Sequence, residues 1–421
     1  MLKQIPITDL IVDMYISEIL ETAGVPMPKK KKGMIRDIRI ISKFIEIGIQ
    51  QIIIDTAKGL DIASLDPTNT SGDTENDAKT DTNELYSKEI EENLKKLNKD
   101  MKTEHHELSL EWASAKDIFK ASVNILHESM QAIKNDKKIN PDYFHQASKA
   151  ILRSIMRNKD ALTWLGRIRD QHSYLHEHSV NTSILMGLFA HAHGLSKANI
   201  ELCITGALLH DLGQVHIEEE FFQRSGPLTP QEFEQVKEHV NFGFRILAED
   251  DDTSDIIMHI ILEHHERFDG SGYPNGLKRD EISLYGRMFA IVDTYDAVTN
   301  NRNYKKAVPS SDGMRTLLQL SKKNFDESLV HQFIKCMGIY PTGSLVKLNN
   351  GYLAIVIAQN VQSPLKPLVN IMFNTKNNAY INPEIRNMMH DNVENVKITN
   401  YEDPAHFEIN VNEFMPEEME L

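Results

Sequence analysis

The most constraining feature of this 421-residue chain is a stretch of about 200 residues patterned almost throughout for α-helices. Apolar residues recur at helical spacing from residue 142 to about 338, with short loops between the segments. The segment SVNTSILMGLFAHAHG carries Ile184, Leu185 and Leu188 on one face, and IELCITGALLHDLG stops at Gly213. Helices of this kind bury their apolar faces against one another, so the pattern predicts an all-helical domain.

The regions on either side of this stretch differ from it in residue pattern and composition, which predicts separate structural parts. Residues 1–64 read as a small α+β module, with strand-like runs in IPITDLIVDMYISEIL and QQIIIDT and helical spacing in IRDIRIISKFIEIG. Residues 65–85 are polar and predict a disordered linker, and residues 86–141 predict connecting helices. We assign 142–341 to the helical domain. We expect 342–421 to be a β-rich extension, because SLVKLNNGYLAIVIA forms two alternating runs across an Asn-Gly turn.

Composition excludes several classes of protein. Lys and Arg number 46 against 61 Asp and Glu, a net charge of −15, which argues against a binder of nucleic-acid polymers. Two cysteines, Cys203 and Cys336, are too few for a disulfide framework or a thiolate zinc site. The first twenty residues do not resemble a signal peptide, and no run is long and apolar enough to insert into a membrane. We therefore expect a cytoplasmic location.

Histidines and aspartates recur within the helical stretch, beside apolar helical segments or within them. Imidazole and carboxylate groups are the usual ligands of Fe, Mn, Zn and Ni. A lone histidine such as His239 also fits an ordinary surface or core position, and the pair His210-Asp211 alone is ambiguous. Together the motifs predict a metal site, because helices that share a core can aim such groups at one point. The candidate ligands are His178, His210, Asp211, His239, His264, His265 and Asp293.

The order of these motifs resembles the HD-GYP family of metal-dependent phosphohydrolases. LLHDLG is similar to the His-Asp signature, HHERFDGSGYP to the signature that names the family, and DTYDAVTNNRNY to the segment that closes the site. The resemblance covers roughly residues 170–338 and implies an HD-type helical metallohydrolase fold. The first sixty residues resemble, more weakly, a domain of unknown function that often precedes such domains.

The resemblance implies two divalent metal ions. His178, His210, Asp211 and Asp293 would hold one ion, and Asp211 would bridge to a second. That second ion would also be held by His239, His264 and His265. A third ion in some members uses a glutamate where this chain has Tyr174, so we expect two. Fe or Mn is the first expectation, with Ni, Mg and Zn as alternatives.

The same resemblance implies catalytic and substrate-binding roles. Asp211, Asp296 and Gln214 are the catalytic candidates, and Asp296 would orient a ligand or the nucleophile. Arg302, Lys305, Gln214 and Tyr273 are the substrate-binding candidates, although NNRNYKK alone also fits a solvated basic patch and DGSGYP alone a tight turn. Gly270 and Gly272 allow positive φ. Gln214 is a departure, because the family usually has lysine there.

These features predict an enzyme that cleaves phosphodiesters with metal-activated water. The resemblance implies a cyclic dinucleotide substrate, chiefly cyclic di-GMP hydrolysed to pGpG or GMP in bacterial second-messenger signalling. Two alternatives remain open: an impaired cyclic di-GMP receptor, supported by Gln214, and a hydrolase for another nucleotide such as cyclic GMP-AMP. A protein partner at the Gly-Tyr-Pro loop and a homodimer are further expectations.

Overall fold

The computed structural model describes two compact units, Met1–Thr80 and Asp81–Leu421, which we treat separately. The described residues are 2–7, 14–19, 33–34, 44, 49, 51–56, 58, 107–166, 174–223, 226, 228–248, 253–300, 308–360, 363–389 and 396–414. The predicted linker at 65–85 lies outside them, as does most of the predicted helix in IRDIRIISKFIEIG.

The first unit contains a four-stranded antiparallel sheet in the order β1-β4-β2-β3. Its strands are β1 (Leu2–Pro6), β2 (Tyr15–Ile19), β3 (Gly33–Met34) and β4 (Gln51–Asp55). Buried isoleucines at Ile5, Ile16, Ile52 and Ile54 form its core. The strand-like runs predicted near the N-terminus are therefore confirmed.

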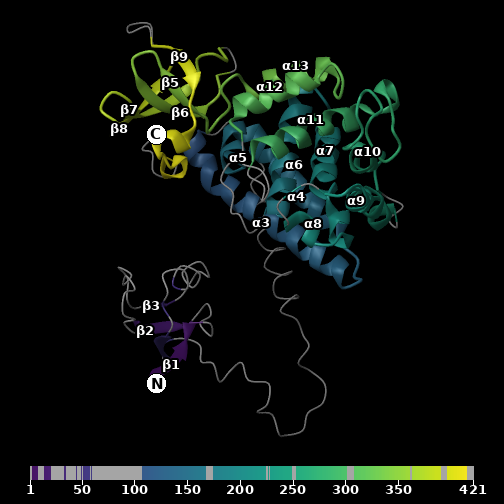
Figure 1. The fold of residues 1–421 in the computed structure, drawn as a ribbon, viewed down its shortest axis with the longest axis horizontal. Coiled ribbons are helices and arrows are strands. Elements are labelled where there is room, and N and C mark those ends of the chain that lie inside the picture. Colours follow the sequence, from purple (N-terminus) through teal and green to yellow (C-terminus); the bar gives the residue numbers. More distant parts are fainter. Residues whose placement is uncertain are drawn as a thin grey trace. The chain divides into compact units, whose positions relative to one another are not determined.

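The second unit is mainly helical, as predicted (Figure 1). Asparagine and serine side chains begin several of its helices: Asn140 accepts a hydrogen bond from the backbone N–H of Asp142, and Ser254 accepts one from Ile256. Its helices are α3 (Leu108–Lys134), α4 (Pro141–Arg157), α5 (Lys159–Leu165), α6 (Tyr174–His193), α7 (Lys197–Leu209), α8 (Glu220–Gln223), α9 (Pro230–Ala248), α10 (Asp255–Glu263), α11 (Leu284–Thr299), α12 (Ser310–Leu320) and α13 (Glu327–Met337), with short 3₁₀ turns at η3 (Leu212–His216) and η4 (Arg279–Glu281).

Helix α6 lies at the centre of this unit, packed against α3, α4, α5, α7, α11 and α13. Its apolar residues are buried on all sides, including Val180, Met186 and Phe189, so it is not the one-faced helix that the spacing of Ile184, Leu185 and Leu188 predicted. Helix α7 also differs, because it ends at Leu209 and not at Gly213. The chain turns there into η3, for which Gly213 has a packing role described below.

A five-stranded antiparallel sheet follows the helices, in the order β8-β7-β6-β5-β9. The predicted hairpin across Asn-Gly is present between β5 and β6, with Leu345 opposite Ile355 and Gly351 at a φ of +90°. Residues 353–357 of β6 are buried without alternation, because one face meets the helical core and the other a separate apolar cluster. The strands are β5 (Leu345–Leu348), β6 (Tyr352–Ala358), β7 (Leu368–Asn374), β8 (Ala379–Asn387) and β9 (Ile398–Tyr401), followed by 3₁₀ turns at η5 (Pro404–Phe407) and η6 (Val411–Phe414).

Helix α5 fixes this sheet to the helical core, beside which Figure 1 shows it. The indole of Trp164 donates a hydrogen bond to the carbonyl of Ile357 at 3.1 Å. The buried carboxylate of Asp160 accepts one from the hydroxyl of Thr342 at 2.6 Å. These buried contacts join the sheet to the helices within one compact unit.

Candidate metal centre

Five elements bring the predicted ligands together. His178 lies near the start of α6, His210 and Asp211 directly follow α7, and His239 lies within α9. His264 and His265 follow α10, and Asp293 lies within α11. All are buried except His265, which is partly exposed. The helical core therefore converges these imidazole and carboxylate groups on one interior region.

The ligand atoms form two groups. Among the described residues, the atoms of His178, His210 and Asp293 lie within 4.8 Å of one another, and so do those of His239, His264 and His265. Asp211 lies between the groups. Its Oδ2 is 3.1 Å from Nε2 of His210, and its Oδ1 is 3.5 Å from Nε2 of His239. One carboxylate thus presents a different oxygen to each group.

Three histidines are oriented by their own helices. Nδ1 of His210 donates to the carbonyl of Ala207 at 2.8 Å. The same bond, three residues back, joins His239 to Val236 at 2.6 Å and His264 to Ile261 at 2.7 Å. A ring whose only proton is on Nδ1 points the lone pair of Nε2 into the centre. This arrangement is how proteins fix the tautomer of metal-ligating histidines.

The residues present fit a bound cation. Nε2 of His210 is buried and has no hydrogen-bond partner among the described residues. Nε2 of His239 and Nε2 of His264 lie 3.3 Å apart, and both are acceptors when Nδ1 carries the proton. Buried acceptors that face each other are unfavourable without a shared positive charge. Nitrogen and carboxylate donors suit Fe, Mn, Zn or Ni.

The electrostatics of the centre keep most of its ligands in their binding-competent forms. Burial raises the pKa of Asp211, but His210, His239 and His178 together hold that pKa well below its usual range. Burial, with His210 and His239, lowers the pKa of His264 to about 3. His178 differs: burial lowers its pKa, but hydrogen bonds with Asp293 and Asp296 reverse this and raise it to about 9. A cation that binds His178 near neutral pH must therefore displace a proton.

Asp296 orients His178 from the side opposite the centre. Its Oδ2 accepts a hydrogen bond from Nδ1 of His178 at 2.6 Å. Its Oδ1 accepts bonds from the amides of Asn181 and Asn300, the latter at 2.9 Å. Asn181 lies one turn after His178 and Asn300 one turn after Asp296, so both asparagines share the helical face of a predicted site residue. That spacing could have revealed them, but the sequence analysis did not identify either residue.

Gly213 allows η3 to lie against α9. A Cβ atom at this position would overlap the carbonyl of His239 and the backbone nitrogen of Gly243. The contact brings the turn after Asp211 onto the helix that carries His239, which closes the distance between the two ligand groups. Gly213 is therefore required for close approach and not as a helix stop.

The turn after His265 is held by Glu266. Its buried carboxylate accepts hydrogen bonds from the backbone N–H groups of Asn275, Gly276 and Leu277, at 2.7, 3.1 and 3.0 Å. Sequence reasoning had assigned Glu266 no role, although a buried acid beside a glycine-rich turn is a signal for one.

The two glycines of that turn act differently. Gly270 has the expected positive φ, +81°. Gly272 does not have one, contrary to expectation, and a Cβ there would instead overlap the backbone of Glu266 and Arg267. Both glycines thus let the turn fold back on the histidine pair, which brings the ring of Tyr273 to 4.7 Å from that of His265. Burial and the negative charge of Asp293 raise the pKa of Tyr273, so its phenol is neutral.

The remaining substrate-binding candidates are less closely connected to the centre. Gln214 lies in η3, half-buried, and its backbone N–H donates to the carbonyl of Asp211 at 3.0 Å. Arg302 and Lys305 lie outside the described residues, in 301–307. The structure therefore places Tyr273 beside the ligands and Gln214 one turn from Asp211.

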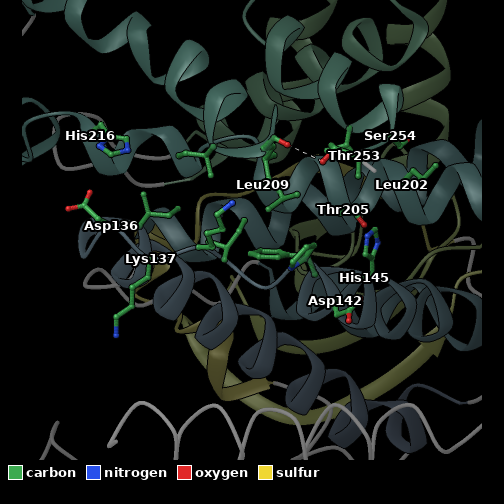
Figure 2. A pocket seen from close by; sticks show the side chains of 18 residues that line it. Asp136, Lys137, Asp142, His145, Leu202, Thr205, Leu209, His216, Thr253 and Ser254 are labelled. Atoms are coloured by element: carbon green, nitrogen blue, oxygen red, sulfur yellow. Dashed lines mark hydrogen bonds between the residues drawn. The ribbon is translucent and has the colours of Figure 1, made fainter. Parts of the chain in front are cut away.

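A cavity of about 760 Å³ lies elsewhere, lined by the ends of α3 and α9, the starts of α4 and α10, and one side of α7. Figure 2 shows Leu202, Thr205 and Leu209 of α7 facing it, with His216 and Ser254 on its margin. None of the metal-ligand candidates lines it. The cavity is therefore separate from the candidate metal centre, whose ligand atoms are buried.

Among the described residues, no helix combines the length and apolar character needed to cross a membrane.

Three family models match the chain. The HD domain matches residues 166–329, which hold all the candidate ligands, and a domain of unknown function (DUF3391) matches residues 2–144. A KOW domain associated with HD domains matches residues 345–399, the region of the C-terminal sheet.

Two relatives match all or part of these regions. Cyclic di-GMP phosphodiesterase PA4108 of Pseudomonas aeruginosa is 28% identical over 91% of this chain and 88% of its own length. A cyclic di-GMP phosphodiesterase of Thermotoga maritima is 37% identical over 42% of this chain, which spans about half (48%) of that relative. The solved structure of Bd1817, an HDG"Y"P protein from Bdellovibrio bacteriovorus, has the same fold. Its TM-score is 0.50 at 16% identity, over 79% of this chain and 98% of that one.

Proposed function

Because this chain belongs to the HD-GYP family of HD domain proteins, we propose that it is a metal-dependent phosphodiesterase that hydrolyses cyclic di-GMP. The observation that carries the proposal is the position of Asp211, whose two oxygens face two separate groups of buried ligand atoms. A paired centre of this kind suits a phosphodiester, whose charge increases during displacement.

In this proposal, His178, His210, Asp211 and Asp293 hold one divalent ion, and Asp211, His239, His264 and His265 hold a second. The ions are Fe or Mn, with Ni, Mg and Zn as alternatives. When bound, such ions stabilise the developing negative charge and lower the pKa of water enough for attack near neutral pH.

The protein's own groups prepare that chemistry by fixing orientation. Backbone carbonyls hold the tautomers of His210, His239 and His264, and Asp296 holds His178. Because these rings are locked before substrate arrives, little reorganisation is needed during the reaction. Tyr273 closes one side of the centre, and Arg302 and Lys305 are the candidates for binding phosphate. We assign Gln214 the role of a neutral donor to substrate, in place of the usual lysine.

The test is hydrolysis of cyclic di-GMP by purified protein supplied with Mn²⁺ or Fe²⁺. Formation of pGpG or GMP by wild type and loss of product in His210→Ala support the proposal. Tight binding of cyclic di-GMP without product would instead identify a receptor, the alternative that Gln214 favours.

A second substrate is favoured by two other relatives. The 3'3'-cGAMP-specific phosphodiesterases 2 and 3 of Vibrio cholerae are 32% and 28% identical over 35% and 43% of this chain. Parallel assays with 3'3'-cGAMP separate the two candidates, since the true substrate has the higher kcat/KM.

A further inference from the structure

An aromatic and cationic cluster extends from the candidate metal centre along α9. The ring of Tyr273, 4.7 Å from that of His265, also meets the ring of Phe233 edge-on at 6.1 Å. Nζ of Lys237 lies 4.9 Å from the centre of the Phe233 ring and 5.4 Å from that of Tyr273. The contacts therefore run without interruption from a candidate ligand to the protein surface.

The outer part of this cluster is open to solvent and is anchored by hydrogen bonds at the start of α9. Phe233 is 44% exposed, which is high for a large aromatic ring, and Lys237 is partly exposed. Thr229 and Glu232 exchange hydrogen bonds at the start of α9 and fix the turn that carries Phe233. Glu234 holds the ammonium group of Lys237 at 2.7 Å.

We infer that Phe233 and Lys237, with Tyr273, form a second binding surface beside the metal centre that takes the parts of a cyclic dinucleotide that are not being cleaved. Phe233 stacks on a purine base, because every base presents a π-face to an aromatic ring. Lys237 supplies a compact positive charge to the second phosphate. The inference rests on the proposed function, since the base and the second phosphate that this surface binds are parts of a cyclic dinucleotide.

The test compares substrates with and without these parts. Phe233→Ala is expected to raise KM for cyclic di-GMP and to weaken equilibrium binding of GMP, each about tenfold. It leaves kcat and KM unchanged for methyl p-nitrophenyl phosphate, a diester without a base. Leu318→Ala is the matched control, because Leu318 is 43% exposed but lies on α12.

Lys237→Met keeps the apolar stem and removes the charge. It is expected to raise KM for cyclic di-GMP several-fold at low ionic strength, and the difference from wild type shrinks as salt screens the phosphate. A lysine that only packs the loop would give no such salt dependence.

The inference is overturned if Phe233→Ala leaves both the KM for cyclic di-GMP and the GMP affinity unchanged. It is also overturned if turnover of the methyl diester falls as much as that of cyclic di-GMP, since the cluster would then serve only to pack the loop. If the proposed function is wrong, wild type cleaves the methyl diester and not the cyclic dinucleotide. In that case GMP binding by the variants still decides this inference.

Discussion

The Nε2 atoms of His239 and His264 lie 3.3 Å apart in the interior, and each ring donates its Nδ1 proton to a helix carbonyl. When Nδ1 carries the only proton of each ring, the two Nε2 lone pairs face each other. The arrangement is stable when a positive ion lies between the nitrogens, which is why the centre is best understood as a metal site.

Removing the bridging carboxylate should affect both ligand groups. Asp211→Asn keeps the size of the side chain but halves its oxygen ligands, so we expect loss of most bound metal and at least a hundredfold loss of turnover. Elemental analysis and a hydrolysis assay measure the two effects. His259→Asn is a suitable control, because His259 bonds Glu263 and is not a candidate ligand. Full metal content in Asp211→Asn would argue against a shared carboxylate.

Asp296 should act through His178 and not through the substrate. Asp296→Asn removes the charge that orients the imidazole, and such a loss typically costs 10- to 100-fold in metal affinity, or about that much in activity. Competition with a metal indicator dye measures the affinity. If high metal concentration restores kcat, the role is positioning. Unchanged affinity would show that the hydrogen bond to His178 is not important for binding.

Metal binding should strengthen as the pH rises toward about 9. Hydrogen bonds with Asp293 and Asp296 outweigh burial and raise the pKa of His178 to about 9, so this ring must lose a proton before it binds an ion. In metal-free protein its charged form contributes stability fully below about pH 6.5, the unfolded value, and this stability is lost as pH rises through about 9. The increase in Tm caused by Mn²⁺ is therefore expected to grow as the pH rises from about 6.5 to about 9. A Tm increment independent of pH would contradict the prediction.

Gly213 and Gly243 should respond differently to substitution by alanine. A Cβ at Gly213 overlaps backbone atoms of α9, whereas one at Gly243 meets the side chain of Ile261 at 3.4 Å, an ordinary contact. We expect Gly213→Ala to lower the free energy of unfolding by about 1–3 kcal/mol and Gly243→Ala to change it little. Denaturant unfolding of both metal-free variants measures this. Equal effects would show that the close approach of η3 to α9 is not required.

Gln214→Lys tests the departure from the family pattern. A hydrogen bond to a charged group is worth about 1.5–3 kcal/mol, so a lysine that reaches the substrate phosphate retains or raises turnover of cyclic di-GMP. Steady-state kinetics give the answer. A loss of activity in Gln214→Lys would show that this site has adapted to glutamine.

The sequence predicted the centre better than its surroundings. Motifs such as LLHDLG and HHERFDGSGYP combine several chemically unusual residues, so the positions of His210, Asp211 and His264 could be expected to converge. The spacing of Asn181 and Asn300 from His178 and Asp296 is only a weak signal, because an asparagine one turn from a site residue is common on any helix. Gly272 was misjudged since a close backbone approach has no local signature.

The fold, too, could be predicted from the sequence only in part. Helical spacing predicted α6 and α7, and the Asn-Gly turn predicted the β5–β6 hairpin. The burial of α6 on every side and of β6 on both faces depends on elements distant in sequence, such as the contact of Trp164 with Ile357. Tertiary packing, which local periodicity does not encode, decided these features.

The most direct test is the metal content of protein purified with Mn²⁺ or Fe²⁺, measured by elemental analysis beside the rate of cyclic di-GMP hydrolysis. We predict about two ions per chain in wild type, with product formed, and a loss of both in Asp211→Asn. Metal-free wild-type protein that still hydrolyses cyclic di-GMP at an undiminished rate would contradict the assignment of the buried histidines and aspartates as the reaction centre.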